Sequence, residues 1–173
     1  MAVLQRLAKT CIYQRLGLQT SLKSDGVDVF KQFLDLMEAH SLDFHSTFRK
    51  LAAFRPDHVQ SGDEKLNAFI SHLLESTPRP DKLDKAKASN EFKAWLTKYS
   101  NRILEERKEW DGNSQEEIDV LREKQMKSAN PRFVLRQWVL EEVIAKVEKD
   151  VVTGSRVLAK VLKVRFRNYL VIG

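Results

Sequence analysis

Apolar residues recur every three or four positions along most of the chain, which is the period of a helix with one buried face. The clearest stripes lie in residues 29–37, 44–51, 66–74, 92–103 and 118–121. This pattern predicts an all-α fold, an irregular bundle of about six to seven helices.

Local signals predict where these helices begin and end. Residue types that cap helix N-termini stand before the stripes at Ser24 or Asp25, at Asp43 and at Ser114. Gly17 has the position of a helix stop, and Asn130-Pro131 is a further start signal. Thr77-Pro78-Arg79-Pro80 cannot be helical, and we expect an internal linker over residues 77–88.

Length and composition are typical of one globular domain: 173 residues, 42% hydrophobic and 31% charged. The single Cys11 cannot form an internal disulfide, which suits a reducing compartment. No apolar run reaches the roughly 18 residues that span a bilayer, so we expect no membrane association.

The net charge of +6 is concentrated at the two ends of the chain. Residues 1–24 and 151–173 contain no acidic residue, whereas residues 25–150 have a net charge of −3. A nucleic-acid-binding protein usually gathers its basic groups in one stripe, so this distribution disfavours nucleic acid as a partner. The acid-free start is also typical of a transit peptide, but Leu4, Leu7 and Cys11 follow helical spacing and favour a core helix.

The residues themselves predict no catalytic, cofactor-binding or metal site. The chain contains no Gly-rich phosphate loop, HExxH, CxxC or nucleophile elbow. The spacing of His40 and His45 is poor for a metal site on one helix, and we expect exposed or capping histidines near helix ends. Adjacent acidic pairs such as Glu105-Glu106 point about 100° apart on a helix, which predicts solvated faces.

Arg136 is the one charged residue whose position is unexpected. In a helix from Pro131 to Lys149, Arg136 would project from the middle of the apolar arc, with Arg132 on the same side one turn earlier. A buried guanidinium needs a partner. One interpretation is a salt bridge to a carboxylate such as Glu105, Glu106 or Asp35. The other is that Arg136 and Arg132 clamp a phosphate or an acidic segment of a partner domain.

Residues 13–18 and 130–138, with other segments between them, resemble in the same order segments of the selenoprotein O family. Residues 130–138 (NPRFVLRQW) are similar to a motif near the C-terminus of these proteins, and residues 13–18 (YQRLGL) to an upstream segment. Trp95, Tyr99 and Arg102 match in order, and the likeness covers about residues 10–162. We therefore expect one helical region over residues 1–162, followed by a divergent basic tail over residues 163–173.

The resemblance implies the C-terminal helical part of a protein-kinase-like fold, with the catalytic lobes absent. The family binds ATP and magnesium and transfers AMP to protein hydroxyls, but the residues that do so lie upstream of everything present here. The family's C-terminal redox motif is also missing, since Cys11 is the only cysteine. The resemblance further implies a mitochondrial location, with the cytoplasm as the alternative and secretion not expected.

Three functions follow from these observations. The first is a helical C-terminal fragment of an AMP-transferring pseudokinase, inactive alone, whose partner is the missing kinase-like domain or its protein substrates. The second is a non-enzymatic helical module that binds another protein through an amphipathic face. The third, a basic RNA-associated protein, is disfavoured by the charge distribution.

Overall fold

The computed structural model describes residues 11–112, 114–130 and 137–167. All regular elements in these ranges are helical, which confirms the all-α class. The chain divides into two compact units, Met1–Asn130 and Pro131–Gly173, each of which is described by itself. Among the helices in the described ranges, none combines the length and hydropathy needed to cross a membrane.

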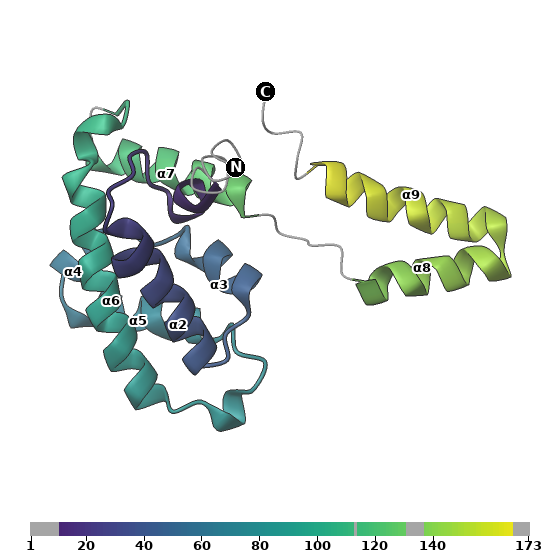
Figure 1. Cartoon of the computed structure of the whole chain (residues 1–173), viewed down its shortest axis with the longest axis horizontal. Coiled ribbons are helices and arrows are strands. Elements are labelled where there is room, and N and C mark those ends of the chain that lie inside the picture. The colour runs from purple at the N-terminus through teal and green to yellow at the C-terminus, as the bar shows by residue number, and fades with distance from the viewer. Residues whose placement is uncertain (1–10, 113, 131–136, 168–173) are drawn as a thin grey trace. The chain divides into compact units, whose positions relative to one another are not determined.

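The first unit is an irregular bundle in which the long helix α6 packs against α2 and α5 (Figure 1). Residues 11–16 are helical. The elements that follow are a π-helical turn η1 (Gly26–Lys31), α2 (Gln32–Ala39), α3 (Phe44–Leu51), α4 (Asp57–Gln60), α5 (Asp63–Leu74), a 3-10 turn η2 (Pro80–Lys82), α6 (Lys85–Glu105), a 3-10 turn η3 (Arg107–Glu109) and α7 (Gln115–Ala129).

Aromatic rings connect these helices through the core. The rings of Phe33 on α2 and Trp95 on α6 stack with centroids 4.3 Å apart, and Trp95 stacks in turn on Tyr99 at 4.9 Å. The ring of Phe48 on α3 meets Phe33 edge-on, and Phe54 packs against Tyr99. All five side chains are buried, and burial of rings of this size is the main driving force for folding of such a core.

Local polar signals set several helix ends as predicted. The side chain of Asp43 accepts a hydrogen bond from Ser46 N–H, and that of Ser114 accepts one from Glu117 N–H. Asp25 differs from the prediction, because its carboxylate makes no cap for its own helix. Asn130 ends α7, where its side-chain Nδ2 donates to Met126 O, and its predicted role at Pro131 involves residues outside the described ranges.

The predicted linker is shorter in the structure, because α6 begins at Lys85. Asp84 caps this helix, with Oδ1 accepting from Lys87 N–H at 3.0 Å. The charged stretch after Pro80 was interpreted as linker because large apolar residues are few in it, but residues 85–87 in the first turn of α6 are exposed and need none.

The second unit is an antiparallel hairpin of α8 (Gln137–Lys149) and α9 (Val151–Arg167) (Figure 1). Gly154 allows the two helices to touch, since a Cβ there would lie 2.3 Å from the Cα of Val147. Val143 is buried, while Ile144, Val151 and Val152 remain exposed. The hairpin therefore leaves part of its apolar surface uncovered.

Gly17 is required by the turn that ends the first helix. Its φ of +65° lies in the left-handed region, and Leu18 N–H reaches back to Tyr13 O at 2.9 Å, as in a Schellman motif. A Cβ at this position would lie 2.7 Å from Arg122 Cγ and from Met126 Cγ. Only glycine satisfies both constraints.

We predict that Gly17→Ala lowers the free energy of unfolding by more than about 1 kcal/mol, because the left-handed backbone and the contact with α7 both oppose a side chain. Gly26→Ala is the matched control, since nothing lies within 4 Å of its Cβ. The control should be neutral or stabilising by about 0.5–1 kcal/mol. Urea denaturation of both variants measures the difference, and equal stabilities would contradict this role of Gly17.

Candidate functional site

The charged residues singled out in the sequence, Arg132 and Arg136, lie outside the described residues. All three proposed carboxylate partners lie in the described ranges, and two of them have other cations beside them. Asp35 pairs with Lys31 at 2.6 Å, and Glu106 pairs with Arg102 at 3.1 Å. The interpretation of Arg136 stays a prediction.

A buried ion network lies at the C-terminal end of α6. Arg102 Nε donates to Asp25 Oδ1 at 2.8 Å, and its Nη1 donates to Glu106 Oε2 at 3.1 Å. The side chains of all three residues are at most 6% exposed. Arg102 Nη2 also donates to the carbonyl oxygen of Thr20 at 2.9 Å. The network thus joins the loop before η1 to α6.

Glu106 corrects the prediction that the adjacent acidic pairs are solvated, because its carboxylate is buried. It accepts hydrogen bonds from five donors: Gln19 N, Thr20 N, Thr20 Oγ1, Arg102 Nη1 and Trp110 Nε1. Neighbouring positions on a helix do not predict which one faces another segment, so the sequence could not reveal this. A carboxylate occupied in this way holds the fold together and is not free to bind a metal.

Arg122 on α7 is a second buried arginine, and sequence reasoning did not single it out as buried. Its Nη2 donates to the carbonyl oxygen of Phe54, and its Nη1 to the hydroxyl of Tyr99 at 3.1 Å. The Tyr99 hydroxyl donates to the carbonyl oxygen of Leu16. Burial raises the pKa of Tyr99 to about 12, so this phenol stays protonated and available as a donor.

The histidines occupy different environments. His40 ends α2 and is buried, with Nε2 2.7 Å from Glu91 Oε2. His58 is half-buried between the rings of Phe54 and Phe69, and burial lowers its pKa below the usual 6.5. Within the described ranges, no group of three or more His, Cys, Asp or Glu side chains is placed to hold a metal ion.

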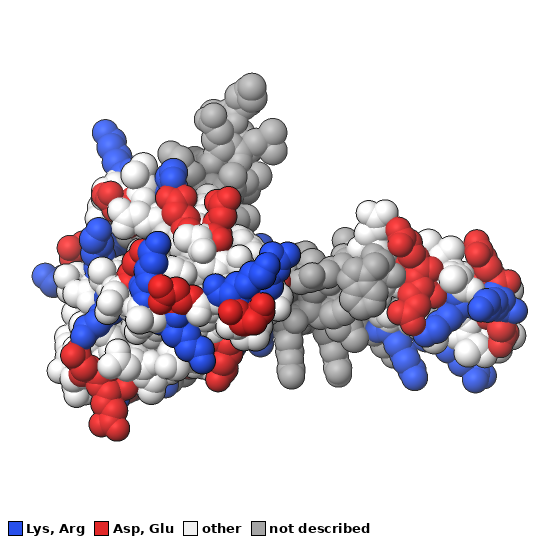
Figure 2. Space-filling model, turned by 90° about the horizontal axis from the view of Figure 1, so that it is seen from below, with Lys and Arg blue, Asp and Glu red and all other residues white. Residues whose placement is uncertain are grey.

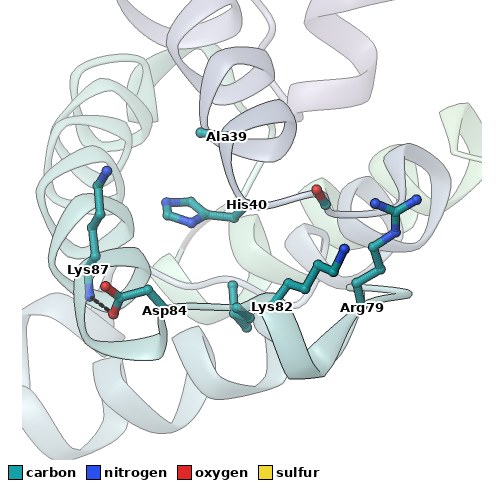
Figure 3. Close-up of a pocket in the computed structure, with 8 residues that line it drawn as sticks. Ala39, His40, Arg79, Lys82, Asp84 and Lys87 are labelled. Carbon is teal, nitrogen blue, oxygen red and sulfur yellow. Dashed lines mark hydrogen bonds between the residues drawn. The ribbon is translucent and has the colours of Figure 1, made fainter.

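A small cavity lies between the end of α2, the connection from α5 to α6 and the first turn of α6 (Figure 3). Its volume is about 160 Å³, and its lining includes His40, Ser41, Arg79, Lys82 and Asp84. In Figure 3, Arg79 and Lys82 lie on one side of His40, and Asp84 lies on the other. Elsewhere on the first unit, the face seen in Figure 2 shows basic and acidic side chains interspersed.

Comparison with known proteins identifies the family. The family model described as "Protein adenylyltransferase SelO" matches residues 2–162, nearly the whole chain. The chain belongs to the SelO family. The match confirms the resemblance drawn from residues 10–162. The matched range contains the buried residues Tyr99, Arg102 and Arg122.

Curated relatives of this SelO-family chain carry the name "Protein nucleotidyltransferase YdiU". The protein of Paraburkholderia xenovorans is 33% identical over 150 residues, which are 86% of this chain and 24% of that protein. Those of Cronobacter sakazakii and Pseudomonas fluorescens are each 29% identical, over 79% and 88% of this chain. The chain spans about a quarter of the length of these relatives. No solved structure matches it.

For this SelO-family chain, we predict that Arg102→Met is strongly destabilising, because it leaves two buried carboxylates without their cation. The expected loss is about 3–5 kcal/mol of unfolding free energy. Lys31→Met removes a surface pair of the same type and should cost only about 0–1 kcal/mol. Thermal and urea unfolding of both variants provide the comparison. Similar losses in the two would show that the buried network does not hold the loop.

Acid should weaken the fold through His58. Its pKa is lowered in the folded state, chiefly by burial, so the unfolded chain takes up the proton first as the pH falls. The contribution of the neutral His58 ring to the free energy of unfolding is therefore complete above about pH 6.5, and it is lost as the pH falls below that value. Protonation would also oppose the hydrogen bond from Arg55 N–H to Nδ1.

The measurement is urea unfolding of the parent and of His58→Phe between about pH 7.5 and pH 5. The phenyl ring keeps the packing and cannot be protonated, so the variant should lose less stability over this range. His72→Gln, at an exposed histidine, serves as the control and should follow the parent. A pH dependence identical in parent and His58→Phe would refute the assignment.

Proposed function

We propose that this chain is the helical C-terminal portion of a SelO-family protein nucleotidyltransferase, and that it supports AMP transfer without carrying it out. ATP and magnesium are held, in this proposal, by a kinase-like domain outside the present residues. The chain's function is then to complete and stabilise the protein that bears the chemistry.

The proposal rests on one comparison of coverage: nearly all of this chain is matched, but only a small part of each relative. The family model covers residues 2–162, yet the aligned region is only 22–26% of the relatives named as nucleotidyltransferases. A whole catalytic apparatus for ATP needs a phosphate cradle, a metal-ligand set and a nucleotide cleft. Those parts are expected in the remaining three quarters of such proteins.

The internal chemistry of the first unit also supports a structural role. The carboxylates of Asp25 and Glu106 are buried with Arg102, and Glu106 receives five hydrogen bonds. The guanidinium of Arg122 is occupied by Phe54 O and by the hydroxyl of Tyr99. These strong polar groups are buried and connect segments of the fold to one another.

Docking onto a kinase-like domain is supported by apolar surface on the first unit. A groove of about 420 Å³ lies between α2 and α6, and its lining combines the apolar residues Leu36, Ala39, Ala94 and Trp95 with charged side chains. A surface that combines apolar residues with charged ones is compatible with packing against another domain. In this proposal the kinase-like domain covers the groove.

We predict that the purified 173-residue chain does not transfer AMP. The assay combines the chain, ATP labelled in its α-phosphate, magnesium and a generic protein acceptor, and follows label on protein after gel separation. The Paraburkholderia xenovorans relative, run in parallel, is the positive control. We expect label on protein with the relative and background label with the chain alone.

A second readout tests nucleotide binding directly. Isothermal titration of the chain with ATP and magnesium should give no saturable heat. Label transfer above background, or micromolar ATP binding that requires magnesium, would overturn the proposal that the chemistry lies elsewhere.

A further inference from the structure

The cavity beside His40 is built by contacts between two segments far apart in the sequence. The Thr77 hydroxyl donates to Ser41 O at 3.2 Å and accepts from Arg79 N–H at 3.2 Å. Asp43 N–H donates to Ser76 O at 3.0 Å in the same region. One hydroxyl thus fixes the backbone of Arg79 against that of Ser41, at the mouth of the cavity.

The cavity is lined by more positively charged than negatively charged side chains. Arg79, Lys82 and Lys87 line it, and none of the three forms an ion pair with a carboxylate of the described residues. The one lining carboxylate, Asp84, accepts from Lys87 N–H as the cap of α6. Figure 3 shows Asp84 on the far side of His40 from Arg79 and Lys82.

The ring of His40 separates these two sides and is held in place. It is buried, and its Nε2 lies 2.7 Å from Glu91 Oε2. In Figure 3 the side chains of Arg79 and Lys82 both extend from the connection toward the loop that follows His40, and Ser41 also lines the cavity. The two cations therefore lie at one end of the cavity, and the carboxylate of Asp84 lies at the other.

The volume limits what can enter. A cavity of about 160 Å³ holds roughly five waters, enough for one tetrahedral oxyanion with some hydration. It is far below the roughly 300–1,000 Å³ typical of sites that enclose a whole small molecule such as a nucleoside. A guanidinium fork suits two oxygens of a phosphate, and an ammonium adds a point charge.

We propose that this cavity binds a single phosphate group, either of free inorganic phosphate or of a phosphate monoester, through Arg79 and Lys82, with the Ser41 hydroxyl as a further donor. Thr77 is a positioning residue, because it holds Arg79 beside Ser41 without facing the anion. The site is separate from AMP transfer, and it stands or falls independently of that function.

The test is a titration of the 15N-labelled chain with inorganic phosphate, at constant ionic strength kept with sodium chloride, followed by amide chemical shifts. Saturable shifts should be confined to residues around Ser41 and between Thr77 and Lys87. Arg79→Gln should weaken the fitted affinity about tenfold or more, because it removes a charge-assisted pair of hydrogen bonds.

Two further variants separate a built site from general attraction to positive charge. Lys124→Gln removes an exposed cation on α7, remote in sequence from the cavity, and should leave the affinity unchanged. Thr77→Val keeps every charge and nearly the same shape, yet it should weaken phosphate binding several-fold. Circular dichroism melts establish that each variant is folded.

AMP and adenosine distinguish the two sources of the phosphate. If AMP shifts the same amides and adenosine does not, the site takes a phosphate monoester with its nucleoside outside. If only inorganic phosphate does so, the site takes the free ion. Shifts that do not saturate, that spread over exposed lysines generally, or that survive Arg79→Gln would overturn the proposal.

Discussion

The guanidinium of Arg102 is a full positive charge in the interior, and such a charge is tolerated only beside opposite charge and hydrogen-bond partners. Asp25 and Glu106 supply the charge from two sides. Two carboxylates against one cation leave a surplus negative charge, which N–H and O–H donors from the loop at Gln19 and Thr20 offset. The conformation of this loop, and hence the entry into η1 and α2, follows from one buried arginine.

Arg122 follows the same rule one helical turn away, beside Tyr99 on α6. Its contacts with Phe54 O and with the Tyr99 hydroxyl bring α7 onto the segment after α3 and onto α6. Its aliphatic stem passes so close to Gly17 that a methyl group would not fit between them. The stacked rings of Phe33, Trp95 and Tyr99 lie in the apolar core, and the two arginines connect the segments around it.

The sequence predicted what depends on nearby residues and missed what depends on distant ones. The caps at Asp43 and Ser114 and the stop at Gly17 are local, because donor and acceptor lie within five residues of one another. Asp25 was one of two residues, with Ser24, expected to cap the next helix, and Glu106 was expected in solvent, because their partners cannot be inferred without the packing of the helices. The cavity was missed for the same reason, since Arg79 and Ser41 become neighbours only when the connection folds back on α2.

The sequence separation of 77 residues from Asp25 to Arg102 also has a consequence for synthesis of the protein. At about 5–20 residues per second, a ribosome completes Arg102 roughly 4–15 s after Asp25. During that interval Phe33 and Phe48 are present without Trp95, and the loop at Thr20 has no anchor. The nascent chain therefore exposes apolar rings that its own later residues must cover. Because Arg122 on α7 contacts Phe54 and Tyr99, the first unit can complete its folding only after α7 has been synthesised.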